Sequence, residues 1–133
     1  MARATLPFFF LCCICVGAVS AADGVYSKAQ AARGKASYGQ GCAKCHGANL
    51  EGGEVAPALS GADFQRKWAG RTVAQLFNLI LQTMPTDDPG SLSRRESADI
   101  VALVLEANDY PSGPKDLGST AEALAAIQIL PKK

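Results

Sequence analysis

The chain has 133 residues, of which 48% are apolar and 19% are charged, so it has room for one folded domain and lacks the composition of a disordered protein. Thirteen basic and twelve acidic residues give a net charge of +1. Because a protein that binds a phosphate backbone needs an excess of positive charge on one surface, we expect no nucleic acid partner.

The N-terminal segment has the features of a secretory signal peptide. Arg3 is followed by an uncharged apolar run from Phe8 to Val19 and then by small residues. Cleavage after Ala21 or Ala22 would place small residues at both positions that signal peptidase recognises. The alternative is an uncleaved membrane anchor, although the run is shorter than the roughly 20 residues needed to cross a bilayer.

Cleavage would divide the chain into a signal peptide, residues 1–22, and one domain, residues 23–133. We expect this domain in the periplasm, with no stable insertion in the membrane. The cysteines that would leave with the signal are Cys12, Cys13 and Cys15. Cys42 and Cys45 would remain, together with twelve basic and twelve acidic residues.

Capping boxes, in which Ser or Thr precedes Gln or Glu by three positions, predict the starts of four helices. They are Ser27 with Gln30, Thr72 with Gln75, Ser93 with Glu96, and Ser119 with Glu122, the last opening a short helix before Pro131. We expect the first helix to end near Tyr38, because Gly39 and Gly41 follow. The string GGEVAPALSG, residues 52–61, is rich in Gly and Pro and predicts a loop.

Apolar residues at helical spacing support the two central helices. They are Val73, Leu76, Phe77 and Ile80 before the prolines of TMPTDDPG, and Ile100, Leu103, Val104 and Ala107 before NDYPSGP. No run alternates with period two, so we predict an all-α fold. Helices this short bury a small core, so we expect a bound group to fill its centre, with a helical domain without a cofactor as the alternative.

The motif CAKCH could belong to a zinc site, a redox pair, a disulfide or a haem attachment site. Zinc needs four Cys or His ligands, and the exported chain offers only Cys42, Cys45 and His46. A thioredoxin-like pair requires a neighbouring strand, and a disulfide would close a very small loop and leave His46 unexplained. A c-type haem uses all three residues, since each thiol bonds a vinyl group and the histidine binds iron. We therefore predict one haem c, covalently attached through Cys42 and Cys45.

Met84 is the candidate for the second axial ligand of the haem iron. It is the one methionine left after Met1 is removed, and it lies between an amphipathic helix and Pro85. The alternative is a methionine that fills the core. A thioether ligand favours Fe(II) and raises the reduction potential, and two filled axial positions leave no open site for oxygen chemistry. We therefore predict an electron carrier rather than an enzyme.

The strings CAKCHG, APALSG and TMP, followed by an amphipathic helix, stand in an order that resembles class I c-type cytochromes. The resemblance spans residues 29–110. On LEGGEVAPALSGADF and WAGRTVAQLF, the chain looks most similar to small bacterial haem c domains that are free in the periplasm or associated with quinoprotein and related dehydrogenases. The resemblance implies four to five short helices around one haem c, with a C-terminal extension after about residue 110.

The resemblance also implies roles for further residues. Pro57 matches the proline whose carbonyl accepts a hydrogen bond from the proximal histidine, and Leu59 matches an apolar residue packed on the haem. Gly34 and Tyr38 match the glycine and the aromatic residue of the first helix, where the last helix crosses closely. The chain departs from the pattern at Leu103, since the last helix usually offers an aromatic residue there.

Several polar or charged side chains have two possible roles, one in binding and one that is purely structural. Trp68 and Arg71 could bind the haem propionates, because an indole N–H and a guanidinium donate to carboxylates; the alternatives are a core aromatic and a solvated charge. A basic cluster could form a docking surface or a solvated face. Its members are Lys28, Arg33, Lys35 and Lys44.

Three functions are compatible with these residues. The first is a monomeric periplasmic carrier that takes one electron from a donor protein and passes it to a terminal oxidase or another cytochrome through brief contacts. The second is the dedicated electron-acceptor subunit of a periplasmic dehydrogenase, with the segment after Tyr110 available for docking. The third is a five-coordinate haem enzyme or gas sensor in which Met84 is not bound to the iron.

Overall fold

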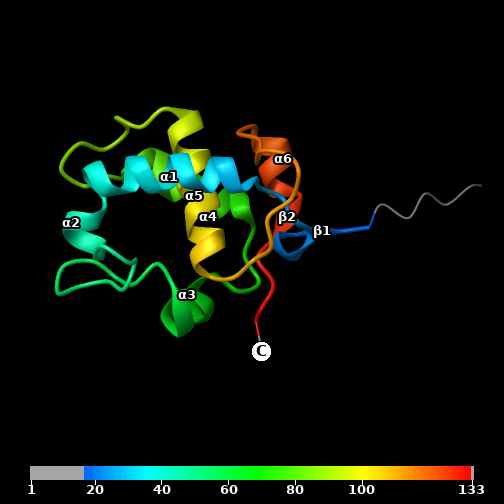
Figure 1. The fold of residues 1–133 in the computed structure, drawn as a ribbon, viewed down its shortest axis with the longest axis horizontal. Coiled ribbons are helices and arrows are strands. Elements are labelled where there is room, and N and C mark those ends of the chain that lie inside the picture. The colour runs from blue at the N-terminus through cyan, green and yellow to red at the C-terminus, as the bar shows by residue number, and fades with distance from the viewer. Residues whose placement is uncertain (1–16, 133) are drawn as a thin grey trace, which may run out of the picture.

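The computed structural model describes residues 17–132, so residues 1–16 of the signal peptide predicted for residues 1–22 lie outside the described residues. The elements are β1 (Val19–Ser20), the 3₁₀-helix η1 (Ala21–Asp23), α1 (Lys28–Gly41), α2 (Ala43–His46), α3 (Gly61–Trp68), α4 (Val73–Thr83), α5 (Arg94–Ala107), α6 (Ala121–Ala125) and β2 (Ile127–Gln128). The described part is mostly helical (Figure 1), which confirms the predicted all-α class. The sequence did not predict η1, α2, α3 or the parallel pair of two-residue strands. Helix α1 continues to Gly41, beyond the end predicted near Tyr38.

Two of the four predicted capping boxes form as expected, at Thr72 and Ser93. The other two differ. The Ser27 hydroxyl accepts a hydrogen bond from the backbone N–H of Gln30, but the Gln30 side chain does not accept one from the backbone N–H of Ser27. The last short helix is capped by Thr120, one residue later than predicted, because its hydroxyl accepts from the backbone N–H of Ala123.

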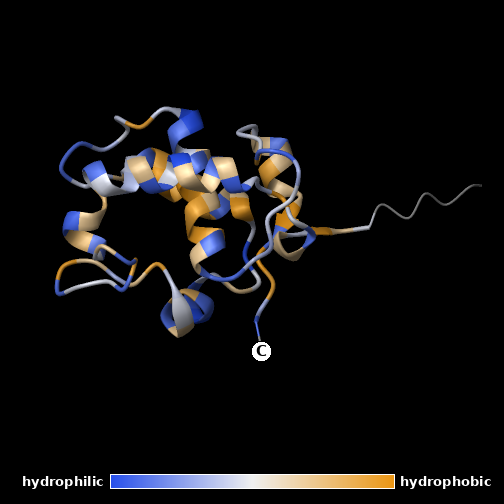
Figure 2. Ribbon diagram, viewed as in Figure 1, coloured by the Kyte–Doolittle hydropathy of each residue, from blue (hydrophilic) through white to orange (hydrophobic). Residues whose placement is uncertain are grey.

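The core is centred on the crossing of α1 and α5 (Figure 1), and apolar residues gather where these helices meet α4 (Figure 2). A Cβ atom on Gly34 would lie 1.9 Å from the backbone oxygen of Asp99, so only glycine permits this approach. Tyr38 and Leu103 are both buried in the core. The close crossing implied for Gly34 is therefore present, with Leu103 in place of an aromatic residue.

Ion pairs also join α1 to its neighbours. The Arg33 guanidinium donates to both carboxylate oxygens of Asp99, at 3.0 and 3.1 Å, and to Asp116 at 2.6 Å. Asp99 is almost fully buried, so this bidentate pairing compensates a carboxylate that would otherwise be costly to remove from water. The charge of Arg33 is thus paired with two carboxylates, although its side chain is 37% exposed, and it does not add a free positive charge to the predicted basic surface.

The C-terminal extension packs along the rest of the domain. The Gln30 side chain donates to the backbone oxygen of Leu117 at 3.0 Å and accepts from its N–H at 2.6 Å. The backbone N–H of Ile129 donates to the oxygen of Arg71 at 2.9 Å, and the side chains of Leu124 and Ile129 are fully buried. This segment is therefore an integral part of the fold.

Residues near the predicted cleavage site also take part in the fold. Val19 and Ser20 pair in parallel with Ile127 and Gln128, and Ala21 is fully buried. Cleavage after Ala21 would remove this strand pairing and the buried methyl group of Ala21. The position of signal cleavage stays a prediction. Within residues 17–132, the helices are too short or too polar to cross a membrane.

We predict that Gly34→Ala destabilises the domain. The added methyl group meets backbone atoms of Asp99, which cannot rotate away, so the free energy of unfolding should fall by about 1–3 kcal/mol. Denaturant unfolding of the haem-loaded protein would measure the change. Gly39→Ala is the control in the same helix, because a Cβ there meets no atom within 4 Å, and it should be neutral or stabilising by up to about 1 kcal/mol. Equal effects of the two substitutions would contradict the close crossing.

Candidate functional site

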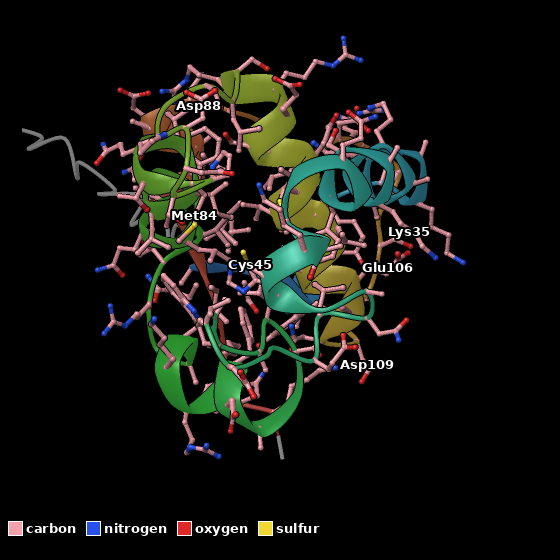
Figure 3. All side chains as sticks on the ribbon, turned by 90° about the vertical axis from the view of Figure 1, so that its left-hand side faces the viewer. Lys35, Cys45, Met84, Asp88, Glu106 and Asp109 are labelled. Carbon is pink, nitrogen blue, oxygen red and sulfur yellow. The ribbon has the colours of Figure 1, made fainter. Side chains whose placement is uncertain are left out.

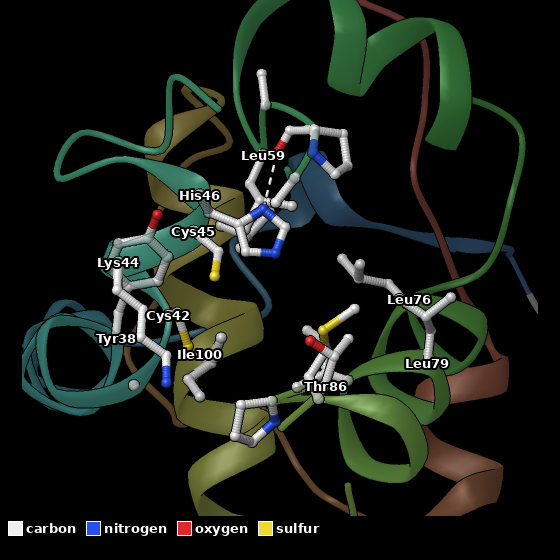
Figure 4. A pocket seen from close by; sticks show the side chains of 18 of the residues that line it. Tyr38, Cys42, Lys44, Cys45, His46, Leu59, Leu76, Leu79, Thr86 and Ile100 are labelled. Atoms are coloured by element: carbon white, nitrogen blue, oxygen red, sulfur yellow. Dashed lines mark hydrogen bonds between the residues drawn. The ribbon is translucent and has the colours of Figure 1, made fainter. Parts of the chain in front are cut away.

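A cavity of about 530 Å³ lies between α2, the loop that follows it, α4 and α5 (Figure 4). This volume is typical of pockets that hold cofactors and other small molecules. Seven of the predicted site residues line it: Cys42, Cys45, His46, Pro57, Leu59, Trp68 and Met84. Arg71 is the predicted residue that is not among the lining residues. Its side chain is exposed and stacks over the ring of Trp68, with its guanidinium carbon 5.5 Å from the ring centroid.

Cys42 and Cys45 present two sulfur atoms on one wall of the cavity. Cys42 joins the end of α1 to the start of α2, and the helical spacing of three residues places both thiols on the same side (Figure 4). Both are free thiols rather than a disulfide. Burial raises the pKa of the Cys42 thiol, with a smaller contribution from Cys45. The pair is thus available for two thioether bonds to one ligand.

His46 is oriented by a backbone carbonyl. Its Nδ1 atom lies 2.8 Å from the oxygen of Pro57, which is the hydrogen bond that the resemblance implies. Because a carbonyl only accepts, Nδ1 carries a proton, and in the neutral ring Nε2 then has the lone pair that can bind a metal. The ring is buried and borders the cavity (Figure 4). The arrangement is suited to an axial ligand of iron.

The loop between His46 and Leu59 is held in place by backbone bonds and by Tyr38. The hydroxyl of Tyr38 donates to the oxygen of Gly47 at 2.6 Å, and the N–H of Gly52 donates to the oxygen of His46 at 2.7 Å. Gly52 has a φ of 81°, and a Cβ there would lie 2.5 Å from the nitrogen of Ala58. Glycine at this position therefore permits the close turn that brings the Pro57 carbonyl to the histidine.

Met84 enters the cavity from another element. It ends α4, its N–H donating to the oxygen of Ile80 at 3.0 Å, and its side chain packs partly against the core. Met84 and Cys45 come from different elements (Figure 3), and both line the cavity. A thioether on one side and a histidine and two thiols on the other, within largely apolar walls, match the donor set that a haem c requires. The residues present therefore fit this group.

Two charged residues that were not predicted from the sequence, Lys67 and Asp87, also line the cavity. Lys67 lies in the last turn of α3, and Asp87 lies in the loop after Met84. Asp87 forms an ion pair with Lys44, and this contact lowers the pKa of the Asp87 carboxyl. Within residues 17–132, no group of three or more His, Cys, Asp or Glu side chains forms a separate metal site.

Residues 29–104 match the sequence model of the family described as "Cytochrome C oxidase, cbb3-type, subunit III". The match covers more than half of the chain and contains the CAKCH motif, Pro57 and Met84. The chain belongs to this family of c-type cytochromes. The family assignment confirms the predicted monohaem c-type cytochrome and implies electron transfer on a haem c.

The fold of this cytochrome is also similar to that of a chain in the crystal structure of the sulfane dehydrogenase SoxCD from Paracoccus pantotrophus. The TM-score is 0.55 and the sequence identity 20%, over 97% of this chain and 67% of that chain. The likeness confirms the cytochrome c-like fold. No curated protein sequence matches the chain.

We predict that Tyr38→Phe lowers stability and flattens its alkaline pH dependence. Loss of the hydroxyl leaves the Gly47 oxygen without this donor, at a cost of about 1 kcal/mol at pH 7. Burial is the main cause that raises the pKa of Tyr38 to about 12, so the folded state keeps the proton that an unfolded tyrosine loses near pH 10. The stabilisation is therefore complete below pH 10 and is lost as pH rises toward 12.

Denaturant unfolding of wild type and Tyr38→Phe at pH 7 and at several values between pH 9 and 12 would measure both effects. The variant should be less stable at neutral pH and should lose less stability above pH 10. The same decline in both proteins would contradict the role of Tyr38.

Proposed function

We propose that the protein is a periplasmic electron carrier that binds one haem c through Cys42 and Cys45, with His46 and Met84 as axial ligands. A haem held by these residues would supply one-electron chemistry between Fe(III) and Fe(II). The observation that supports this function best is the histidine oriented by the Pro57 carbonyl in the same cavity as the Met84 thioether. Its periplasmic location is supported by the signal sequence.

The protein's own residues set the conditions for this chemistry. The Pro57 carbonyl fixes the ring of His46 and increases the electron density of its free nitrogen. Apolar side chains of Leu59, Leu76 and Ile80 form part of the wall, and an apolar wall limits the access of water to a bound group. A dry, apolar surrounding disfavours the more highly charged ferric state and therefore raises the reduction potential.

The mouth of the cavity offers a small apolar rim for contact with redox proteins. Val55 is 80% exposed and Leu79 is 38% exposed, and both line the cavity. Interfaces for electron transfer are small and short-lived, which fits a rim of this kind. We expect transient partners, such as a dehydrogenase, another cytochrome or a terminal oxidase, and a monomeric carrier.

A dedicated subunit of a periplasmic dehydrogenase is the second candidate. It is supported by the fold similarity to a chain of sulfane dehydrogenase SoxCD over almost the whole length of this protein. A subunit should co-purify with one dehydrogenase in fixed proportion when the haem-loaded protein is isolated under mild conditions. A free carrier should elute alone at the size of a monomer.

Met84→Ala is the direct test of the ligand set. The haem should remain covalently attached, because Cys42 and Cys45 are unchanged. The weak long-wavelength absorption band of methionine-bound ferric haem should disappear, and the reduction potential should fall on the order of 0.1 V, within the roughly 0.8 V that axial ligands can span. Optical redox titration would measure both changes.

Leu79→Ala is the matched control, since it also shortens an apolar side chain that lines the cavity on α4. It should keep the band and most of the potential. If Met84→Ala behaves like this control, or if the wild type binds CO or peroxide rapidly, the five-coordinate haem enzyme or gas sensor becomes the better explanation.

A further inference from the structure

The loop that follows Met84 has a single polar link to the opposite wall of the cavity. Its backbone bonds within the described residues are local: Met84 donates to Ile80, Asp88 to Pro85, and Ser91 to Asp88. For loop residues 84–92, the one side-chain hydrogen bond in the described structure is the ion pair between Lys44 and Asp87. Apolar packing of Met84 and Leu92 fixes the two ends of the loop but not its middle.

The ion pair connects the two halves of the site. Lys44 lies between Cys42 and Cys45 in the segment that holds the haem, whereas Asp87 follows Met84 by three residues. Both side chains line the cavity. Figure 4 shows Lys44 on the same side of the cavity as Cys45, and Thr86, the neighbour of Asp87, on the other side.

The other ion pairs in the described residues do not cross the cavity. Arg33 joins α1 to α5 and to the C-terminal extension. Arg66 and Asp63 are neighbours within α3, with side chains 71% and 61% exposed, compared with 55% and 61% for Lys44 and Asp87. The pair on α3 therefore has similar exposure but no part in closing the site.

We propose that Lys44 and Asp87 are positioning residues that hold the Met84 loop against the haem-attachment segment and so keep the Met84 sulfur on the iron. The inference rests on the proposed ligation by Met84. An exposed ion pair contributes little free energy, so its loss should change ligand retention by a few-fold rather than abolish it. Salt should weaken the effect, because both charges face solvent.

The affinity of the ferric protein for imidazole measures how well Met84 is retained on the iron. Imidazole competes with Met84 for one coordination position, so a loop that opens more often gives a higher apparent affinity. Lys44→Gln and Asp87→Asn should each raise the affinity about 2- to 5-fold at low salt. The double variant should resemble either single variant, since both break one interaction. At about 0.5 M salt the differences from wild type should largely disappear.

The two single variants separate loop retention from a general charge effect. Lys44→Gln removes a positive charge and should lower the reduction potential, whereas Asp87→Asn removes a negative charge and should raise it. Loss of the ion pair predicts the same direction of change in imidazole affinity for both. The charge reversal, Lys44→Asp combined with Asp87→Lys, should restore the wild-type affinity.

Two controls complete the experiment. Asp88→Asn removes a charge from the same loop, and Arg66→Gln breaks the ion pair on α3; both should keep the wild-type affinity. The inference is overturned if Asp87→Asn does not change the affinity, or if Asp88→Asn changes it equally. Met84→Ala separates failure of the ligation from failure of the ion pair. If Met84→Ala leaves the spectrum unchanged, the proposed ligation is wrong. If Met84→Ala loses the band but Asp87→Asn does not change the imidazole affinity, only the role of the ion pair is rejected.

Discussion

The close crossing of α1 and α5 at Gly34 is the constraint on which the rest of the site depends. Because no side chain separates the helices there, α5 lies against α1 and presents Ile100 and Val104 to the cavity. The same approach fixes the end of α1, and Cys42 follows directly from that end. The position of the segment proposed to attach the haem is thus determined by a backbone contact eight residues before Cys42, and the partly buried pairing of Arg33 with Asp99 on α5 stabilises the same contact.

Local hydrogen bonds made much of the helical structure predictable, and long-range ones did not. In the capping box at Thr72, both hydrogen bonds form between Thr72 and Gln75, so these two residues alone indicate a helix start. Gln30 has the same spacing from Ser27, yet its amide bonds Leu117, a partner far away in the sequence that no local pattern reveals. Helix α3 was not predicted because Ser60 provides no side-chain cap, and because the buried face of this eight-residue helix consists of only two residues, Phe64 and Trp68.

The same distinction applies to the site. CAKCH contains both thiols and the histidine within five residues, so the motif alone indicates the attachment site. The carbonyl of Pro57 was expected only through resemblance to a family, because a backbone acceptor leaves no mark in the sequence. The pairing of Lys44 with Asp87 was missed, since two charges in separate elements, here α2 and the loop after Met84, have many alternative partners until the fold places them together. Arg71 illustrates the converse: it is close to Trp68 in sequence and in space, yet its side chain stacks outside the cavity.

Two devices stabilise opposite sides of this small domain. Away from the cavity, the C-terminal extension packs α6 against α4 and pairs Ile129 with Arg71, burying apolar side chains that a shorter chain would expose (Figure 1). At the cavity, a haem bound to Cys42 and Cys45 would touch α2, α4 and α5 together, so its binding free energy would add to the stability of all three. Helix α4 is secured by both devices, and Met84 lies at its end. The proposed second ligand, Met84, therefore lies at the end of the helix that the fold supports from two sides.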